Sequence, residues 1–396
     1  MEITVRQGDS LWYYSQLFQI PAQLVYDSNR NINPSQITAG QTIQIPGFTV
    51  SEYTVESGDT FWSLAARRNL NADALSLLNP AVNPQQLTIG QRLLLPARVT
   101  WRVVDGQEAY NYEAMNEDIN QLINIYPFLM TETIGNSVMG KNITEIRVGR
   151  GAKQVHTNSS FHANEWITTP VMMWFLNDYL LAVTNNGSIA NINMPEIYNN
   201  VLWSIVPMVN PDGVNLVLNG LPEQEPYRSE VLEINGGSRD FSGWKANIRG
   251  VDLNNQFPAK WEIEKARKRQ VPSPRDYPGP FPLSEPEAQA MAELTRSMDF
   301  RRVNALHTQG EVIYWGFEDQ EPPEAETIVQ EYANVSGYLP IRTVESYAGY
   351  KDWFIQEWNR PGFTIELGRG TNPLPLSQFN QIYRAASGIL LANLYM

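Results

Sequence analysis

The sequence contains no cysteine and only three histidines among its 396 residues. Without cysteine there can be no disulfide and no thiolate metal ligand, although this absence does not settle the compartment. No apolar run approaches the roughly 20 residues that a membrane-spanning helix requires. With a net charge of −13, the chain also lacks the clustered positive charge with which proteins bind nucleic acids. We therefore expect neither a membrane nor a nucleic acid among its partners.

Hydrophobic residues make up 42% of the chain and charged residues 18%, which is typical of a globular protein with a large core. The one basic cluster, residues 260–269, lies between two proline-containing stretches, and we expect a solvated loop there. The first residues show no positively charged stretch followed by an apolar one, so they do not predict a secretory signal. On this ground we expect a cytoplasmic location.

The first hundred residues contain one pattern twice, at a constant spacing of 50 residues (Val55 against Val5). Such a duplication indicates two small modules. Each copy predicts a strand, a Gly-Asp turn, two helices and a closing strand, with Asp9 or Ser10 capping the first helix. Pro21 suits the first position of the second helix. The positions shared by both copies include, numbered in the first, Thr4, Val5, Gly8, Asp9, Trp12, Asn29, Asn33, Pro34, Gly40, Gln41 and Pro46.

This β-α-α-β pattern resembles the LysM module, with residues 1–47 as the first copy and residues 51–97 as the second. The resemblance implies binding to glycans that contain N-acetylglucosamine, such as peptidoglycan or chitin. A short linker at residues 47–51 would let two weak sites act together on one polymer. Trp12 and Trp62 are expected to pack the small cores rather than stack on sugar. The implied grooves are formed by residues 8–11 with 29–33, and by residues 58–61 with 79–83.

Two of the three histidines stand in contexts that predict a metal site. Residues 155–161 indicate a strand and residues 166–183 a helix, which places His162 and Glu165 at a strand-to-helix turn. Zinc is commonly held by imidazole nitrogen and carboxylate oxygen, and a catalytic site keeps one position open for water. His-x-x-Glu alone is a weak signal, because a histidine at a strand end is usually structural. With His307 from a distant segment, the three side chains would complete such a site.

From about residue 110 to the C-terminus, the chain resembles the carboxypeptidase A-like zinc peptidases. The resemblance implies an α/β fold, in which a mixed sheet flanked by helices forms a catalytic domain over residues 100–396, after the two LysM modules. It rests on separated segments of matching sequence, namely residues 161–166, 207–213, 250–255, 277–287 and 363–368.

The resemblance also implies a role for each candidate residue. It implies one zinc ion per chain, bound by His162, Glu165 and His307. Glu366 would take a proton from the attacking water and return it to the leaving amine. Asp252 would accept the second ring proton of a ligand histidine and so fix its tautomer. His156 matches no ligand position, and we interpret it as structural.

Two departures from the digestive carboxypeptidases concern how the substrate is held. Asn254 and Asn255 stand where those enzymes carry Asn-Arg, and that arginine binds the terminal carboxylate of the substrate through two hydrogen bonds. Lys245 replaces an arginine that supports the transition state, and Arg249 is an alternative for the same task. The chain is thus poorly suited to removing single C-terminal residues from ordinary peptides.

The specificity loop of the family corresponds to residues 349–353. Lys351 occupies its pocket-lining position and could pair with an acidic group of the substrate, although a solvated surface lysine is as good an interpretation. The substrate tyrosine of the family is either Tyr347 or Tyr350, and we favour Tyr347.

The chain combines two LysM modules with a zinc peptidase that lacks the carboxylate-binding arginine, which we call the carboxylate clamp. This combination resembles the bacterial γ-D-glutamyl-L-diamino acid endopeptidases, which are associated with sporulation. Such enzymes cut between γ-D-glutamate and meso-diaminopimelate or lysine in the stem peptides of peptidoglycan. Lys351 could then bind the distal carboxylate of diaminopimelate. Two alternatives stay open: a carboxypeptidase that trims stem peptides from their free end, and a non-catalytic wall-binding protein. The intact set of zinc ligands, together with Glu366, argues against the second alternative.

Overall fold

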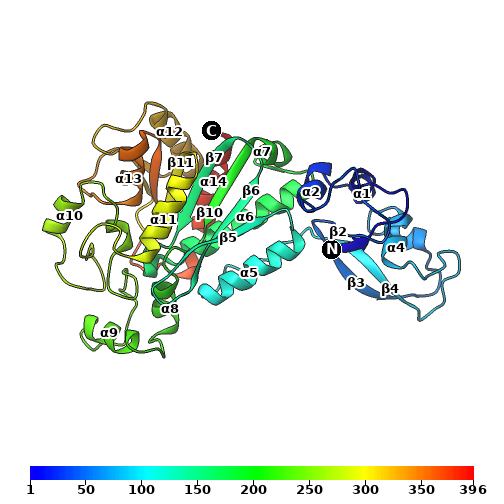
Figure 1. The fold of residues 1–396 in the computed structure, drawn as a ribbon, viewed down its shortest axis with the longest axis horizontal. Helices are drawn as coiled ribbons and strands as arrows, with labels where there is room; N and C mark the ends of the chain where they lie inside the picture. Colours follow the sequence, from blue (N-terminus) through cyan, green and yellow to red (C-terminus); the bar gives the residue numbers. More distant parts are fainter. The chain divides into compact units, whose positions relative to one another are not determined.

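The computed structural model describes all 396 residues, which form two compact units (Figure 1). The first unit contains both repeated modules and two short pieces from later in the chain. The units consist of Met1–Val103, Asp118–Met130 and Asn177–Glu196, and of Val104–Glu117, Thr131–Leu176 and Ile197–Met396. No helix is both long enough and apolar enough to cross a membrane.

The first module follows the predicted order of elements. These are β1 (Glu2–Thr4), α1 (Leu11–Leu17), α2 (Ala22–Asp27) and β2 (Thr42–Gln44). The strands β1 and β2 pair antiparallel. The side chain of Ser10 accepts a backbone N–H from the first turn of α1, so Ser10 is the cap. Pro21 lies one residue before α2 rather than in its first position.

The second module repeats this order with β3 (Phe48–Thr54), α3 (Phe61–Ala66), α4 (Ala72–Leu78) and β4 (Arg92–Arg98). The β-α-α-β prediction is therefore confirmed for both copies. β3 and β4 pair antiparallel along their whole length, from Phe48 against Arg98 to Thr54 against Arg92. Most of the expected linker at residues 47–51 belongs to β3, and pairing with β4 satisfies the backbone groups of this segment.

Trp12 and Trp62 are 60% and 75% exposed, so the prediction that they pack the module cores is wrong. Leu11 and Phe61, one position earlier in each helix, are buried in their place. Successive helical residues are rotated by about 100°, which turns the following tryptophan outward. The core of the second module consists of Val55, Phe61, Leu64, Ala65, Leu75, Leu93 and Leu95.

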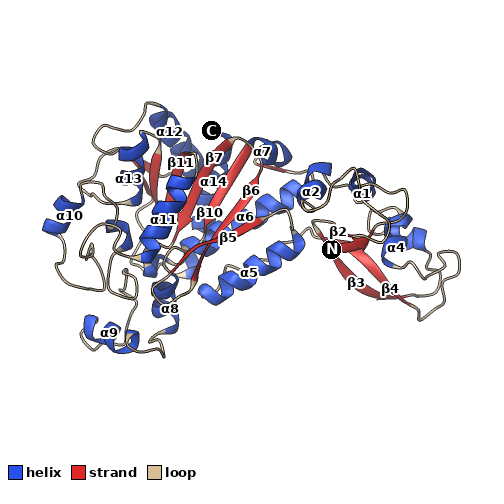
Figure 2. Ribbon diagram, in the orientation of Figure 1, coloured by secondary structure: helices blue, strands red, loops and turns tan.

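An eight-stranded sheet forms the centre of the second unit (Figure 2). Its strands are β5 (Met130–Asn136), β6 (Asn142–Gly149), β7 (Lys153–Ser159), β10 (Val201–Val206), β11 (Phe300–His307), β12 (Val312–Tyr314), β13 (Leu339–Ile341) and β14 (Gly362–Glu366). Their order is β13-β12-β14-β11-β7-β10-β6-β5. The inner strands from β14 to β10 run parallel, whereas β6 and β12 are antiparallel to their inner neighbours. The expected mixed sheet is confirmed.

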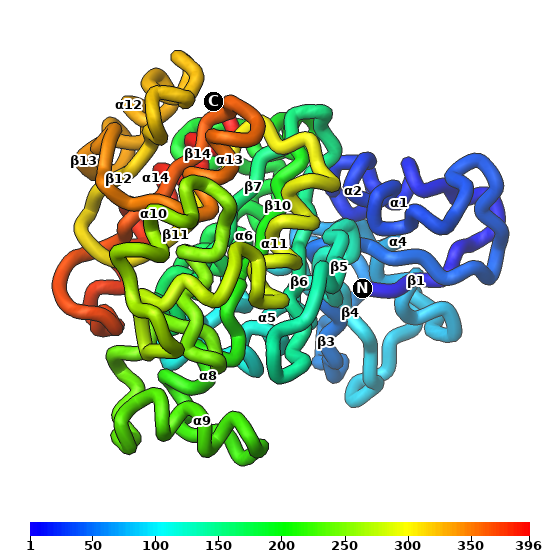
Figure 3. Tube along the Cα trace, turned by 60° about the vertical axis from the view of Figure 1, so that its left-hand side comes forward, coloured from blue at the N-terminus to red at the C-terminus, as the bar shows by residue number.

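Helices cover both faces of this sheet (Figure 3). The helices that follow the two modules in the chain are α5 (Tyr112–Ile125), α6 (Thr168–Thr184), α7 (Met194–Asn200), α8 (Pro211–Asn219), α9 (Tyr227–Ile234), α10 (Trp261–Arg267), α11 (Pro286–Ser297), α12 (Glu324–Ser336), α13 (Tyr350–Trp358) and α14 (Phe379–Tyr395). Side chains alternate along β11. Val303 packs in the core with α11 and α13, whereas Asn304 points the other way and bonds to Tyr332 of α12. The remaining strands, β8 (Ser188–Ile189) and β9 (Ile192–Asn193), form a small hairpin in the first unit.

The predicted loop at residues 260–269 is wrong, since α10 occupies most of it. Trp261 is buried and anchors the helix to the domain. Glu264 is also buried, and it pairs with Arg267 at 2.5 Å one helical turn later. The positive charge of Arg267 is therefore partly neutralised by Glu264 of the same helix.

Candidate metal centre

Three parallel strands bring the candidate ligands to one edge of the sheet. β7, β11 and β14 lie next to or near one another, and the carboxyl ends of parallel strands meet at the same edge. His162 follows β7 and precedes the short helix η1 (Ala163–Glu165), which carries Glu165. His307 ends β11, and the ladder pairs it with Glu366 at the end of β14.

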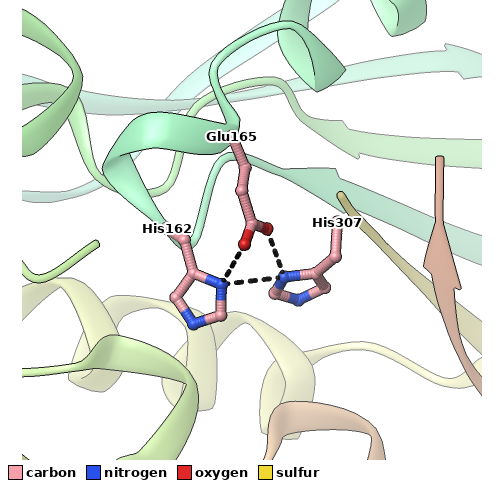
Figure 4. A group of neighbouring side chains, drawn as sticks. All are labelled: His162, Glu165 and His307. Atoms are coloured by element: carbon pink, nitrogen blue, oxygen red, sulfur yellow. Dashed lines mark hydrogen bonds and ion pairs between the residues drawn. The ribbon is translucent and has the colours of Figure 1, made fainter. Parts of the chain in front are cut away.

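The side chains of His162, Glu165 and His307 point toward one another in Figure 4, and all three are buried. Nδ1 of each histidine lies 2.9 Å from a different carboxylate oxygen of Glu165, and the two Nδ1 atoms are 3.2 Å apart. Donors around a tetrahedral zinc ion, with bonds of about 2.0–2.1 Å, are separated by roughly 3.3 Å. Both the spacing and the chemistry of the donors therefore fit one zinc ion.

Asp252 holds the second ring nitrogen of His162. Its Oδ1 lies 3.1 Å from Nε2 of His162, and its Oδ2 accepts the backbone N–H of Asp276 at 3.3 Å. Burial would raise the pKa of Asp252, but His162 and Lys245 hold it well below the usual range. The ionised carboxylate keeps the imidazole proton on Nε2 and leaves Nδ1 free for a metal ion. Nε2 of His307, in contrast, is buried without a hydrogen-bond partner.

Two residues that hold Glu165 in place were not found from the sequence. The backbone N–H of Thr308 donates to Oε2 of Glu165 at 3.2 Å, and Nδ2 of Asn372 lies 3.5 Å from Oε1. The hydroxyl of Thr308 also donates to Oδ1 of Asn372 at 2.7 Å, so the two residues support each other. Their positions in the sequence could have indicated a role at the site, because Thr308 directly follows His307 and Asn372 lies in the turn after Glu366.

Glu366, the predicted general base, lies opposite His307 in the strand ladder, and its carboxyl group is strongly perturbed by its surroundings. Burial and the neighbouring carboxylate of Glu165 raise the pKa of Glu366 to about 8, while Lys245 opposes this rise. A base is most effective when its pKa lies near the working pH. A bound dication would lower the pKa further toward neutrality, because it favours the carboxylate form.

Of the two basic candidates, Lys245 is the one at the site. Its Nζ lies 3.3 Å from Oε1 of Glu165. Burial would lower the pKa of Lys245, but Glu165 and the other carboxylates of the site raise it, so the side chain stays charged. Arg249 instead has Nη1 at 3.5 Å from Oε2 of Glu285. A fixed positive charge beside the ligands can stabilise an oxyanion, and Lys245 is in position to supply it.

Asn254 and Asn255 leave the expected position of the carboxylate clamp without a charge. Oδ1 of Asn254 accepts the backbone N–H of Tyr350 at 3.2 Å and so fixes the start of α13. Asn255 is buried, its Nδ2 donates to the carbonyl of Asn254 at 3.2 Å, and its Oδ1 has no partner. Neither side chain can make the paired, charge-assisted bonds that an arginine gives to a carboxylate.

The structure separates the two candidate tyrosines. Tyr350 is fully buried, and its hydroxyl lies 2.8 Å from that of Thr295, so it belongs to the core. Tyr347 is half-buried and packs edge-on against Phe317. Its contact with the substrate stays a prediction.

Lys351 is not a solvated surface lysine, since only 4% of it is exposed. Its Nζ donates to the carbonyl of Gly316 at 2.7 Å and pairs with Oδ1 of Asp352 at 2.5 Å. Two of its three N–H groups are therefore engaged, and one is left for another partner. A contact between Lys351 and the substrate stays a prediction.

His156, the third histidine, lies in the core. Its ring stacks on Phe300 with the centroids 4.9 Å apart, and its Nδ1 lies 3.0 Å from the hydroxyl of Ser204. Burial lowers the pKa of His156 to about 3, so the ring is neutral. It is not among the residues that converge on the metal centre.

Together these groups define a class of enzyme. A site built from His162, Glu165 and His307 can hold a Lewis acid, Glu366 can move a proton, and Lys245 can stabilise negative charge. These are the functional groups of a metal-dependent hydrolase that acts on a carbonyl group.

The family comparison agrees with this assignment. Residues 115–387 match the zinc carboxypeptidase family, and residues 3–46 and 53–96 each match the LysM domain. The chain belongs to the zinc carboxypeptidase family and is a zinc metallopeptidase with two LysM modules.

Two relatives cover most or all of the chain. The γ-D-glutamyl-L-diamino acid endopeptidase 1 of Lysinibacillus sphaericus is 63% identical over 396 residues, which is 100% of both chains. The uncharacterized protein YqgT of Bacillus subtilis is 45% identical over 296 residues, or 74% of this chain and 79% of its own length.

Solved structures support the fold. Bovine thrombin-activatable fibrinolysis inhibitor, in complex with tick carboxypeptidase inhibitor, aligns with a TM-score of 0.56 at 19% identity, over 73% of this chain and 97% of its own. Carboxypeptidase A from Helicoverpa armigera aligns with a TM-score of 0.55 at 18% identity, over 81% of this chain and 79% of its own. At these identities the likeness concerns the fold alone.

Proposed function

We propose that this chain is an endopeptidase that hydrolyses the bond between γ-D-glutamate and meso-diaminopimelate, or lysine, in the stem peptides of peptidoglycan. The observation that carries the proposal is a complete hydrolytic zinc site next to an uncharged pair, Asn254 and Asn255, where a carboxypeptidase needs a cation. The full-length similarity to an endopeptidase with this specificity supports it. Such cleavage would serve the remodelling of spore or cell-wall peptidoglycan.

A zinc ion held by His162, Glu165 and His307 would polarise the scissile carbonyl and lower the pKa of a water molecule toward about 7. Glu366 accepts the proton of the attacking water on its carboxylate and then delivers it to the leaving amine. Lys245 stabilises the charge that develops on the carbonyl oxygen. The chain therefore supplies the proton transfer and the positive charge from fixed, buried positions.

The two LysM modules would keep the enzyme on its substrate. LysM domains imply peptidoglycan binding, and the stem peptides are attached to the glycan that these modules would hold. In this proposal the modules span residues 1–47 and 51–97, and the catalytic domain spans residues 100–396. A weak site on each module would raise the local concentration of enzyme at the wall.

Product analysis on a defined muropeptide tests the proposal. We expect L-Ala-γ-D-Glu-meso-diaminopimelate to yield L-Ala-γ-D-Glu and the free diamino acid, and we expect the same cut when further residues follow. A matched peptide with an ordinary α-peptide bond before its last residue should be a poor substrate. Release of only the last residue from extended stem peptides would instead establish the carboxypeptidase alternative and refute the endopeptidase.

A further inference from the structure

Trp12 and Trp62 are large apolar side chains that the structure leaves in solvent. They occupy the second position of α1 and α3, directly after the Gly-Asp turn of each module. They are 60% and 75% exposed, and no ring or hydrogen-bond contact involves either indole. An exposed tryptophan adds nothing to the core, so its presence at the same place in both modules needs another explanation.

The two copies differ at the neighbouring positions but not at the tryptophan. Tyr13 and Tyr14 of the first module correspond to Ser63 and Leu64 of the second. Some other positions that are identical in both copies have a structural task. Gly8 and Gly58 both have φ of 88°, and the side chains of Gln41 and Gln91 accept the backbone N–H of Thr38 and Thr88 at 3.1 Å. The tryptophans are the one pair of large apolar side chains that is both identical and exposed in the two copies, which points to a function at the surface.

A salt-bridge network holds the two modules together within the first unit. The guanidinium of Arg6 binds both carboxylate oxygens of Asp73, at 2.7 and 2.6 Å, and the hydroxyl of Tyr13 donates to the same carboxylate at 2.5 Å. The corresponding residues of the other copy are Glu56, Gln23 and Ser63, which cannot form this network. The copies thus diverge where they contact each other, and this contact joins the two modules that carry the tryptophans.

We propose that the indole rings of Trp12 and Trp62 stack on sugar rings of one peptidoglycan glycan strand and so act as a pair of anchors. The proposal rests on the peptidoglycan-binding role of the LysM modules. The two modules each present one exposed indole face, and a glycan strand is a polymer that presents the C–H face of a sugar ring at regular intervals. One strand could therefore contact both indoles. Tryptophan gives such a contact a large area at little cost in side-chain entropy.

Binding of the full-length protein to purified sacculi, and to soluble N-acetylglucosamine oligomers of increasing length, tests this pair. We expect Trp12→Ala and Trp62→Ala each to weaken binding to long oligomers by about 10-fold, and the double variant by about 100-fold. Each single variant should also lose the gain in affinity that the wild type shows with oligomer length. Trp12→Tyr should keep most of the affinity, because it keeps an aromatic face.

Ile89 provides a matched control, since it is 69% exposed in the second module and corresponds to Ala39 in the first. Ile89→Ala should leave glycan binding unchanged. Unchanged binding in the double tryptophan variant would overturn the proposal, and so would an equal loss in Ile89→Ala. Hydrolysis of a soluble muropeptide should be the same in every variant. A wild type that cleaves the muropeptide but binds no oligomer would refute the glycan anchors while leaving the endopeptidase proposal intact.

Discussion

The catalytic unit and the LysM pair present their candidate functional residues in opposite ways. In the catalytic unit, His162, Glu165 and His307 are buried and reach one another from segments far apart in the chain. In the LysM pair, Trp12 and Trp62 are exposed and lie in short local motifs. Buried charges are stable only when they compensate one another, so a change at one of them disturbs the others. The exposed indole rings have no buried partner that depends on them, so they can be replaced with little effect on the stability of the fold.

The largest effect is expected at the catalytic base. Glu366→Gln should lower kcat by about 10²–10⁴-fold, because the amide cannot accept a proton from water. Zinc content and melting temperature should stay close to those of the wild type, since Glu366 is not one of the metal ligands. Turnover, metal analysis and thermal unfolding measure the three quantities. A near-native kcat would show that Glu366 is a structural residue.

The buried pair of Lys351 and Asp352 should have the next largest effect, on stability. Lys351→Met leaves the carboxylate of Asp352 buried without its cation, which typically costs about 3–5 kcal/mol of unfolding free energy. The double variant Lys351→Met with Asp352→Asn should recover much of that loss in urea unfolding. In the same variants, a larger loss of kcat/KM for diaminopimelate than for lysine peptides would assign Lys351 to substrate binding. Equal losses would assign it to the scaffold.

Glu287 on α11 should make stability depend on pH without taking part in catalysis. Burial and the nearby carboxylates of Asp212 and Glu285 raise the pKa of Glu287 to about 8. In the unfolded chain the pKa of Glu287 is about 4.5, so the folded state binds the proton more tightly. The resulting contribution to the free energy of unfolding is fully present below about pH 4.5 and is lost as the pH rises through about 8.

Glu287→Gln cannot ionise, so it should be more stable than the wild type at pH 8 by a few kcal/mol, with a difference that shrinks toward pH 5. Urea unfolding at both pH values measures this. The exposed Glu293 on the same helix is the control, and Glu293→Gln should change stability equally little at both pH values. A constant difference between Glu287→Gln and the wild type would contradict the raised pKa.

Asp252→Ala should weaken zinc binding by about 10–100-fold, because it removes the acceptor that orients His162. Competition with a chelator of known affinity measures the change. Activity should return when zinc is added in excess, which distinguishes an orienting residue from a ligand. If Asp252→Ala bound zinc as tightly as the wild type, its contact with His162 would have no role in the metal site.

The smallest effect is expected at the contact between the LysM modules. Arg6→Ala removes the partner of Asp73, and a partly exposed network of this kind contributes about 1 kcal/mol. Arg67, whose partner Asp59 lies in its own module, is the control. Arg6→Ala should increase proteolysis between the modules and weaken binding to long glycans, whereas Arg67→Ala should do neither. Equal behaviour of the two variants would show that the modules are held together by other contacts.

Much of the candidate site could be predicted because its residues lie in local motifs. His162 and Glu165 fall at a strand-to-helix turn, and Glu366 ends a strand, as the patterns indicated. Asn372 was missed because nothing in the sequence links a turn after β14 to the ligand Glu165. Thr308 was missed although it follows His307, because it binds Glu165 through its backbone N–H, which residue type does not reveal. Helix α10 (Trp261–Arg267) was missed because its stability depends on the burial of Trp261, which a charge-rich stretch does not reveal.

By itself, the sequence determined the duplication at a 50-residue spacing, the order of elements in each module, and the chemical nature of the metal ligands. These are local properties, set by turns, caps and side-chain periodicity. Only the tertiary structure decided which basic residue reaches the site, that Lys351 is buried against Asp352, and that Trp12 and Trp62 face solvent. Each of these depends on which distant segments fill the space around a side chain, and that packing is a property of the whole fold.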